Sequence, residues 1–369
     1  MLAYKIVFCD NSLRDLLNFR GEVIRHFADK GCKIILVAPQ TCDYLSERPN
    51  IRYVPISMNR SGKNPFADFS YFITLCRIYH SEKPDVVFHY TIKPNIYGTI
   101  AARLNGCKSI AMVPGLGYMF TGNSFGKLLG RLMYKSGLRC AHRVMLLNRS
   151  NTEKLVCERF IRPNRAILLE GGEGVDLARF PYVKNQFRSV RFLMVARILY
   201  DKGYLEYVAA AVTVKQKYPD TEFGLLGPLD ETSPMAVPKA MVEKDVSDGK
   251  ITYFGVTDDV PSWLSRDGVV VVCSSYHEGL NRSLMEACAM ARPCITSDIP
   301  GCRETVEEGV NGYLVPMKDS RALANAMIRF IELPLEEKQA MAENSRRLAV
   351  ARFDVDKVID VYDRIIEEL

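Results

Sequence analysis

Two glutamates and their neighbours are the part of this sequence whose types and spacing best suit chemistry. The stretch SSYHEGLNRSLMEACAM, residues 274–290, places Glu278 eight positions before Glu286. Asn281 can act as the N-cap of a helix that would carry Glu286. One carboxylate would then lie in a loop and the other inside a helix. By spacing alone, a binding site and two surface glutamates are equally good interpretations.

The surroundings of this pair indicate what it could bind. The preceding run GVVVVCSS predicts a buried strand, so YHEGL would form the loop at its carboxyl end. The free N–H groups of the helix start, with Gly279 allowing close backbone approach, predict an anion site suited to a diphosphate. Glu286 could accept hydrogen bonds from the vicinal hydroxyls of a ribose, and Glu278 from a sugar hydroxyl. The small residues Ala287 and Ala289 also favour a binding site.

Two cations stand at the end of another predicted strand, in VARILYDKGYLEYV. Arg197 ends the strand and Lys202 follows in the turn before a helix. Such cations could clamp a diphosphate and stabilise negative charge on a leaving group. Taken alone they would be solvated surface charges, but an expected position in the same crevice as the two glutamates favours binding.

The elements that must position these groups alternate between short apolar runs and helical patterns. The first series of strand-like runs comprises YKIVFC, CKIILVAP, DVVFHY, SIAMV, RVMLL and AILLE. After a linker-like segment at 180–190, a second series comprises RFLMVAR, TEFGLLG, ITYFG, GVVVVCSS, PCITSD and GYLVP. These runs are continuously apolar, as parallel strands covered on both faces should be. The alternation predicts doubly wound parallel sheets.

We therefore expect an α/β protein with two Rossmann-like domains, at 1–182 and 190–352, that face a central cleft. Ligands of such folds bind at the carboxyl ends of the strands. A helix over 353–369 is expected to return to the N-terminal domain. The length of 369 residues and the hydrophobic content of 48% suit two domains better than one core.

Charge, cysteines and hydropathy exclude several classes of protein. The first 180 residues carry 26 Lys and Arg against 14 Asp and Glu, and the remainder carries 23 against 29, so the first part is basic and the second acidic. The window 86–152 holds no acidic residue, which indicates an anionic partner. The single, scattered cysteines favour neither disulfides nor a zinc site. No apolar run reaches the ~18 residues of a membrane span, and we expect a cytoplasmic protein.

Several segments resemble the signatures of a known family. ARILYDKG, SYHEGLNRSLMEA, PCITSDIPGCRETVEEGVNGYLV and GGEGVDLARF are similar to those of family 4 retaining glycosyltransferases, which have the GT-B fold of two Rossmann domains. TIKPNIYGTIAARLNG and VPGLGYMFTG resemble the bacterial subgroup that builds surface polysaccharide or glycoprotein glycans. The resemblance implies transfer of an N-acetylhexosamine or hexose from a UDP-sugar to a polyprenyl-diphosphate-linked glycan, without a metal or other cofactor.

The resemblance also implies roles for particular residues. Arg197 and Lys202 would hold the donor diphosphate, Glu278 would contact the donor sugar, and Glu286 would bind the ribose. Backbone N–H groups of Gly279, Leu280 and Asn281 would approach sugar and phosphate, and the base would lie against the backbone near Val256. In the first domain, the loop after strand one, NSLRDLLNFRG, would border the donor phosphates and acceptor. The acceptor and phosphate residues expected there and in the following loops are Asn18, Arg20, Lys93, Gly115 and Gly117.

One segment departs from the family pattern. Many members carry a histidine after the fourth strand of the first domain, close to the anomeric carbon, whereas this chain has FHYTIKPN. The family position falls on Tyr90 or Ile92. His89 could replace the histidine as a catalytic residue, or Lys93 could supply a polar contact, and a core position for His89 is an equal alternative. A front-face retaining mechanism, in which the leaving diphosphate helps to deprotonate the acceptor, needs no such base.

A basic amphipathic helix is expected over SFGKLLGRLMYKSGLRCAHRV. Its cations Lys127, Arg131, Lys135 and Arg139 alternate with apolar residues. Such a helix could lie on the anionic inner face of the plasma membrane, or it could simply cover the sheet. The acid-free window favours the membrane, where a lipid-linked acceptor would be reached.

Two other functions fit parts of the sequence. A catalytically silent nucleotide-sugar-binding or scaffold protein of a glycan assembly complex would explain the departure at FHYTIKPN. Nucleic-acid binding would use the basic first half, but no recognised nucleic-acid motif accompanies the charge. GLGYMF lacks the glycine spacing of a dinucleotide fingerprint, which argues against a nicotinamide site.

Overall fold

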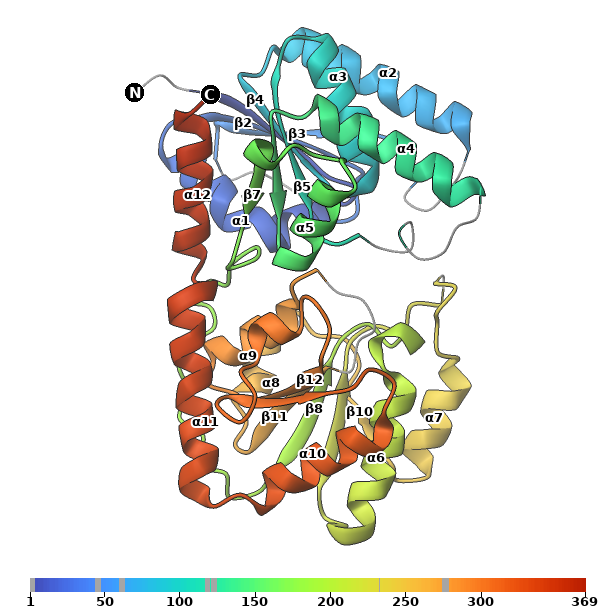
Figure 1. Ribbon diagram of the computed structural model, residues 1–369, viewed down its shortest axis with the longest axis vertical. Helices are drawn as coiled ribbons and strands as arrows, with labels where there is room; N and C mark the ends of the chain where they lie inside the picture. Colours follow the sequence, from blue (N-terminus) through green and yellow to red (C-terminus); the bar gives the residue numbers. More distant parts are fainter. Residues whose placement is uncertain are drawn as a thin grey trace. The chain divides into compact units, whose positions relative to one another are not determined.

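The chain folds into two compact units, each built on its own parallel sheet (Figure 1). The computed structural model describes residues 4–43, 48–59, 64–116, 120, 125–231, 233–273 and 279–369. The first unit comprises Met1–Glu173 and Val355–Leu369, and the second comprises Gly174–Asp354. The prediction of an α/β protein with two Rossmann-like sheets is confirmed.

The described part of the first unit has a seven-stranded sheet in the order β3-β2-β1-β4-β5-β6-β7. All neighbouring strands are parallel. The strands are β1 (Lys5–Cys9), β2 (Lys33–Ala38), β3 (Ile51–Pro55), β4 (Val86–Tyr90), β5 (Lys108–Val113), β6 (Arg143–Leu146) and β7 (Ala166–Leu168). The helices are α1 (Leu13–Asp29), α2 (Pro65–Glu82), η1 (Pro94–Gly98), α3 (Thr99–Leu104), α4 (Phe125–Cys140), α5 (Arg149–Cys157), η3 (Pro163–Arg165) and α12 (Val355–Glu367).

Helices cover both faces of this sheet, which is why its strands are apolar without alternation. Helices α2, α3 and α4 pack on one face, and α1 and α12 lie on the other (Figure 1). On the α12 face, Phe8 stacks on Phe88 with ring centroids 5.4 Å apart, and Phe88 meets Tyr362 of α12 at 5.0 Å. The last helix of the chain is therefore part of the first unit's core.

The described part of the second unit has a six-stranded parallel sheet in the order β10-β9-β8-β11-β12-β13. Its strands are β8 (Arg191–Val195), β9 (Glu222–Leu226), β10 (Thr252–Tyr253), β11 (Val269–Cys273), β12 (Cys294–Ser297) and β13 (Gly312–Val315). Its helices are η4 (Tyr200–Lys202), α6 (Tyr204–Lys217), α7 (Lys239–Ser247), α8 (Val260–Leu264), α9 (Arg282–Ala289), η5 (Arg303–Thr305), α10 (Ser320–Glu332), α11 (Leu335–Leu348) and η6 (Ala349–Phe353).

Both sheets share the strand order that creates a switch point. In each sheet the second and third strands in chain order lie on one side of the first strand, and the fourth and later strands lie on its other side. The switch points therefore lie between β1 and β4 in the first unit and between β8 and β11 in the second. The carboxyl ends of such strand pairs are where open α/β sheets bind ligands.

The boundary between the units corrects the sequence-based division at 182. Residues 174–182 belong to the second unit. The backbone N–H of Val175 donates to the carbonyl of Phe353 at 2.6 Å, and a guanidinium nitrogen of Arg346 donates to the carbonyl of Phe180 at 3.2 Å. These hydrogen bonds to main-chain carbonyls hold the segment against α11 and η6, and hydropathy alone does not show them.

Candidate functional site

The switch point of the second unit brings together three of the predicted features. Arg197 follows β8, and its guanidinium is 55% exposed and lies 2.9 Å from the carboxylate of Asp230, which follows β9. Lys202 ends the short turn η4, and Gly203, with φ of 82°, is the N-cap residue directly before α6. Both cations therefore stand beyond the carboxyl end of β8, as predicted from the sequence.

A glycine allows the loop after β9 to approach this position closely. Gly227 has φ of 146°, and a Cβ at this residue would lie 2.0 Å from the carbonyl oxygen of Ala196. The backbone N–H of Ile198 donates to the carbonyl of Pro228 at 2.9 Å. The Arg197 loop is thus fixed by main-chain contacts from the neighbouring strand's loop.

Helix α9 begins at the same switch point, and the predicted N-cap is confirmed. The Asn281 side chain accepts a hydrogen bond from the Leu284 N–H at 3.1 Å. The Ser283 hydroxyl donates to the carbonyl of Val195, the last residue of β8, at 2.7 Å. The backbone N–H of Asn281 donates to the carbonyl of Gly301 at 2.9 Å. These contacts attach the N-terminus of α9 directly to the end of β8.

Glu286 lies inside α9 and is not a solvated surface acid. Its side chain is 13% exposed, and one carboxylate oxygen accepts from the Arg282 guanidinium at 2.8 Å. Burial raises the pKa of Glu286 above its ordinary value, and the charge of Arg282 partly opposes this shift. A carboxylate held in one orientation by a neighbouring arginine is suited to accept hydrogen bonds from a ligand's hydroxyl pair.

The described members of the remaining predicted donor residues lie in the loops before α9 and after β10. Gly279 is half-buried and Leu280 is buried immediately before the cap, while Val256 is 66% exposed in the loop after β10. Glu278 lies outside the described residues, so its expected contact with a sugar stays a prediction.

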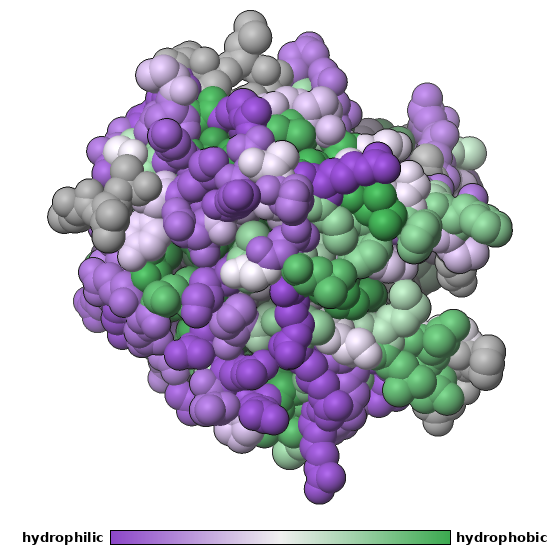
Figure 2. All heavy atoms as spheres, turned by 90° about the horizontal axis from the view of Figure 1, so that it is seen from above, coloured by the Kyte–Doolittle hydropathy of each residue, from purple (hydrophilic) through white to green (hydrophobic). Residues whose placement is uncertain are grey.

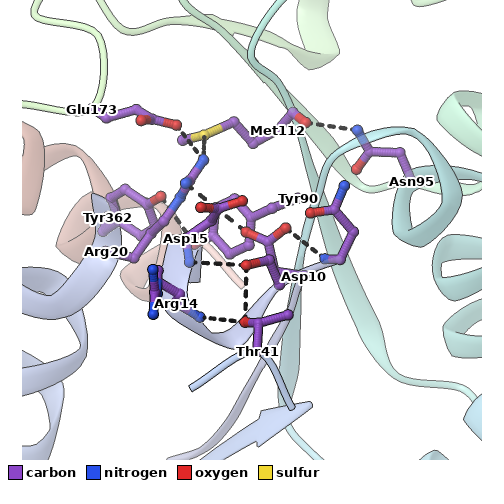
Figure 3. A network of polar contacts seen from close by, with 12 residues as sticks. Asp10, Arg14, Asp15, Arg20, Thr41, Tyr90, Asn95, Met112, Glu173 and Tyr362 are labelled. Carbon is purple, nitrogen blue, oxygen red and sulfur yellow. Dashed lines mark hydrogen bonds and ion pairs between the residues drawn. The ribbon is translucent and has the colours of Figure 1, made fainter. Parts of the chain in front are cut away.

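The switch point of the first unit holds a buried charged network that the sequence analysis did not predict (Figure 3). Asp10 directly follows β1 and is fully buried. One of its carboxylate oxygens accepts from the Asn11 N–H at 2.6 Å. The other has no hydrogen-bond partner and lies 3.9 Å from the guanidinium of Arg20. Arg20 also forms an ion pair with Glu173.

Aromatic side chains complete the surroundings of Arg20. Its guanidinium lies 4.4 Å from the centroid of the Tyr90 ring, at the end of β4. The Tyr90 hydroxyl lies 3.0 Å from the Tyr362 hydroxyl of α12 (Figure 3). Arg20 is therefore one of the predicted residues that does lie at a switch point, although it is 4% exposed and serves a buried network.

The environment of Asp10 gives its carboxyl unusual acid–base properties. Burial raises the pKa of Asp10 to about 6, and the charge of Arg20 opposes the rise. A carboxyl with such a pKa can take up or release a proton near neutral pH. The sequence signal that could have revealed it is the acid directly after the first buried strand, in FCDNS.

The segment NSLRDLLNFRG is mostly helix, so its prediction as a loop is wrong. Helix α1 begins at Leu13 because the Ser12 side chain caps it by accepting from the Asp15 N–H at 3.1 Å. Within this helix Arg20 faces the core and Asn18 is exposed. The two candidates therefore do not act on one ligand from the same face of α1.

His89 is withdrawn from the candidate catalytic residues. Its side chain is fully buried, with one ring nitrogen 3.0 Å from the Tyr79 hydroxyl and the other 3.2 Å from the Ser109 hydroxyl. The ring also packs directly against Gly98. Burial lowers the pKa of His89 to about 3, so the imidazole is neutral and belongs to the core.

The remaining first-unit candidates lie near the ends of β4 and β5. Lys93 forms an ion pair with Asp68 of α2, which also accepts from the Tyr97 hydroxyl at 3.0 Å. Gly115 follows β5 and is half-buried. Gly117 lies outside the described residues.

The cations predicted to touch a membrane are largely engaged with the protein itself. Arg131 of α4 binds the Glu158 carboxylate at 2.6 Å, and Lys135 donates to the carbonyl of Glu158 at 2.9 Å. Arg139 donates to the carbonyl of Arg159 at 3.1 Å. Lys127 is half-buried near the start of the helix. The exposed face of α4 instead carries leucines.

Known proteins resemble the chain in both halves. A family model described as Glycosyl transferases group 1 matches residues 183–348, and one described as Glycosyl transferase 4-like matches residues 6–148. An N,N'-diacetylbacillosaminyl-diphospho-undecaprenol alpha-1,3-N-acetylgalactosaminyltransferase from Campylobacter jejuni is 24% identical, covering 99% of this chain and 100% of the relative. A UDP-Gal:alpha-D-GlcNAc-diphosphoundecaprenol alpha-1,3-galactosyltransferase from Escherichia coli is 26% identical, covering 87% of this chain and 85% of the relative.

A solved structure shows the same fold. The crystal structure of Anabaena Alr3699/HepE in complex with UDP-glucose superposes with a TM-score of 0.77 at 18% identity, covering 99% of this chain and 100% of that one. With the two parallel sheets, this likeness defines the class as the GT-B fold of glycosyltransferases. The chain belongs to the glycosyltransferase family that the two matching models describe. The predictions of family, fold and glycosyltransferase activity are confirmed.

None of the described helices is long and apolar enough to cross a membrane. Among the residues with described positions, no group of three or more His, Cys, Asp or Glu side chains is placed to hold a metal ion.

The raised pKa of Asp10 predicts a pH-dependent stability. Its folded pKa of about 6 exceeds its ordinary value of 3.8, so the stability linked to this carboxyl is present at acid pH and is lost as the pH rises through 6. Asp10→Asn removes this titration. The variant should therefore gain about 2–3 kcal/mol relative to the wild type between pH 4 and pH 7, measured as free energy of unfolding by urea. Asp29→Asn, at an exposed position of α1, is the control. If the difference in free energy of unfolding between Asp10→Asn and the wild type were the same at pH 4 and pH 7, the raised pKa of Asp10 would be contradicted.

Proposed function

We propose that this glycosyltransferase transfers a sugar, with retention of anomeric configuration, from a UDP-sugar to a polyprenyl-diphosphate-linked glycan. One observation carries the proposal: the capped start of α9, the Arg197 loop and the buried Glu286 meet at the switch point between β8 and β11. The reaction would serve bacterial surface polysaccharide or glycoprotein glycan synthesis. The names of the two relatives specify transfer to undecaprenol-linked diphosphate sugars for those proteins.

The donor nucleotide fits the order of groups along α9. The first N–H groups of the helix and the cations Arg197 and Lys202 would hold the diphosphate. Glu286, about one turn into the helix by its position after Asn281, would accept hydrogen bonds from the ribose hydroxyls. The base would lie near Val256, and Glu278 would contact the sugar. The Anabaena protein was solved with UDP-glucose, which supports a UDP-sugar as the donor.

The chemical step then depends mainly on orientation and charge. Departure of UDP leaves negative charge on its diphosphate, and two cations beside it lower the energy of that state. In a front-face reaction the leaving phosphate oxygen takes the acceptor's proton as the new bond forms on the same face of the sugar. His89 is not needed as a base, and its core position is consistent with this mechanism. Because Arg197 and Lys202 supply the positive charge, we propose that the enzyme works without a metal ion or other cofactor.

The sugar is proposed to be an N-acetylhexosamine or a hexose. The Campylobacter relative is named for N-acetylgalactosamine transfer and the Escherichia relative for galactose transfer, and both names specify an undecaprenol-linked diphosphate acceptor. UDP-N-acetylgalactosamine and UDP-galactose are therefore the first donors to test.

Transfer assays test this function directly. We expect one UDP-N-acetylhexosamine or UDP-hexose to yield an α-linked product on an undecaprenyl-diphosphate-linked acceptor, at a rate that EDTA does not change. Arg197→Ala should lower kcat by about 10²–10³-fold because it removes charge stabilisation of the leaving group. The control is Arg188→Ala, an exposed arginine of the same unit. If UDP-sugars bind but are neither transferred nor hydrolysed with any acceptor, the protein is instead a silent binding or scaffold component.

We also propose that α4 brings the first unit to the inner face of the plasma membrane. Leu128, Leu129 and Leu132 form one side of the helix and are 54%, 51% and 54% exposed. Three exposed leucines on one helix side suit insertion among lipid headgroups, with the helix cations beside them. Figure 2 shows apolar side chains gathered on the side of the viewed surface on which α2 and α4 lie in Figure 1. The leucines, more than the internally bound cations, would make the contact.

Vesicle flotation tests this contact. The wild-type chain should float with vesicles that contain phosphatidylglycerol, and the triple change Leu128→Ser, Leu129→Ser and Leu132→Ser should reduce the bound fraction about tenfold or more, because burial of each leucine is worth about 1.5–3 kcal/mol. A matched change at exposed Leu205 of α6, Leu205→Ser, should have no effect. Equal flotation of the triple variant and the wild type would rule out the leucine surface.

A further inference from the structure

A pocket rich in arginine lies at the edge of the first sheet opposite to the Asp10 network. It has a volume of about 620 Å³. Its walls come from the ends of α3, α4 and α5 and from η3, segments that lead into the amino ends of β5, β6 and β7. The lining residues are Arg103, Leu138, Arg139, Val156, Arg159, Phe160, Ile161, Arg162, Pro163 and Arg165.

The described lining of this pocket is strongly cationic. Five of its lining residues are arginines, and among the described residues that line it there is no aspartate or glutamate. The nearby Glu158 carboxylate is bound to Arg131. Positive charge also extends beyond the pocket, since the pKa of neighbouring His142 is lowered by burial and then by Lys108 and Arg165 among other cations. Guanidinium groups stay charged at any physiological pH, so their repulsion is a standing cost that an anion would relieve.

Main-chain carbonyls orient two of these guanidinium groups. Arg165 donates to the carbonyls of Arg139 and Ala141 at 3.0 and 3.1 Å, and Arg139 donates to the carbonyl of Arg159 at 3.1 Å. Carbonyl oxygens satisfy donors without cancelling the charge, so the arginines are held in place and remain cationic. Arg159 itself has φ of 57°, a left-handed backbone conformation that non-glycine residues seldom adopt.

We infer that this pocket is an anion site for a phosphate group. Five arginines line one space, and planar guanidinium groups match the oxygens of a phosphate or diphosphate, which accept paired hydrogen bonds. The apolar residues of the floor, Leu138 and Phe160 among them, would accommodate the organic part that the phosphate carries. Two sources share this chemistry: a soluble phosphate compound and the headgroup of an anionic lipid.

The site is independent of the proposed donor site. GT-B proteins and other doubly wound folds bind their nucleotides at the carboxyl ends of strands, whereas this pocket lies at the amino ends of three strands of the first sheet. The inference therefore does not depend on the proposed function, and it would stand if the chain transferred no sugar.

Charge reversal at exposed pocket residues tests the inference. Arg162 and Arg103 are exposed on the rim, so Arg162→Glu and Arg103→Glu should leave the fold intact, which thermal unfolding would verify. Arg77→Glu, at an exposed position of α2, changes the net charge equally and is the matched control. Sodium pyrophosphate is titrated calorimetrically into each full chain, and flotation with phosphatidylglycerol-containing and pure phosphatidylcholine vesicles is measured in parallel.

The two arms distinguish the two sources. If the ligand is soluble, both pocket variants should bind pyrophosphate about tenfold or more weakly than the wild type and the Arg77→Glu control. If it is a lipid headgroup, the pocket variants should lose binding to phosphatidylglycerol vesicles while the control keeps it. Unchanged binding in both arms, or an equal loss in the Arg77→Glu control, would overturn the inference.

Discussion

The constraint on which both units depend is the reversal of strand order in a parallel sheet. Connections from the strands on either side of a switch point run in opposite directions, so neither covers the carboxyl ends between them. In the second unit this leaves room beside β8 for the Arg197 loop and for the start of α9. The Ser283 hydroxyl, bound to the Val195 carbonyl at 2.7 Å, makes the helix start part of the strand end. The chemistry of the site follows from that attachment.

The two switch points are used in physically different ways. In the second unit Arg197 pairs with Asp230 in an exposed loop, and Glu286 pairs with Arg282 inside a helix. In the first unit the guanidinium of Arg20 is buried with Asp10 and Glu173. Burying three charged groups costs desolvation energy, and the raised pKa of Asp10 expresses that cost. Tyr362 of the last helix closes over this network, which links the end of the chain to the fold's first strand.

Much of the fold could be predicted from the sequence because buried parallel strands are short, continuous apolar runs. The cap of α9 was also readable, since an asparagine before a helical pattern has a clear local role. The side of the sheet toward which the His89 side chain points could not be predicted. Successive residues of β4 face opposite sides, and only the packed structure shows that Tyr90 faces Arg20 while His89 faces Tyr79. The binding partners of the α4 cations were equally hidden, because Glu158 comes close only through tertiary packing. The position of Asp10 directly after the first strand could be seen in the sequence, but its complete burial could not be predicted from it.

We propose above all that the start of α9 and the Arg197 loop bind the donor nucleotide. Hydrogen exchange of the full chain, followed by mass spectrometry with and without UDP, tests it most directly because the helix N–H groups themselves are the proposed ligands. UDP should slow exchange in peptides that cover 196–203 and 279–290. If both segments exchanged at the same rate with saturating UDP as without it, the proposed nucleotide site would be contradicted.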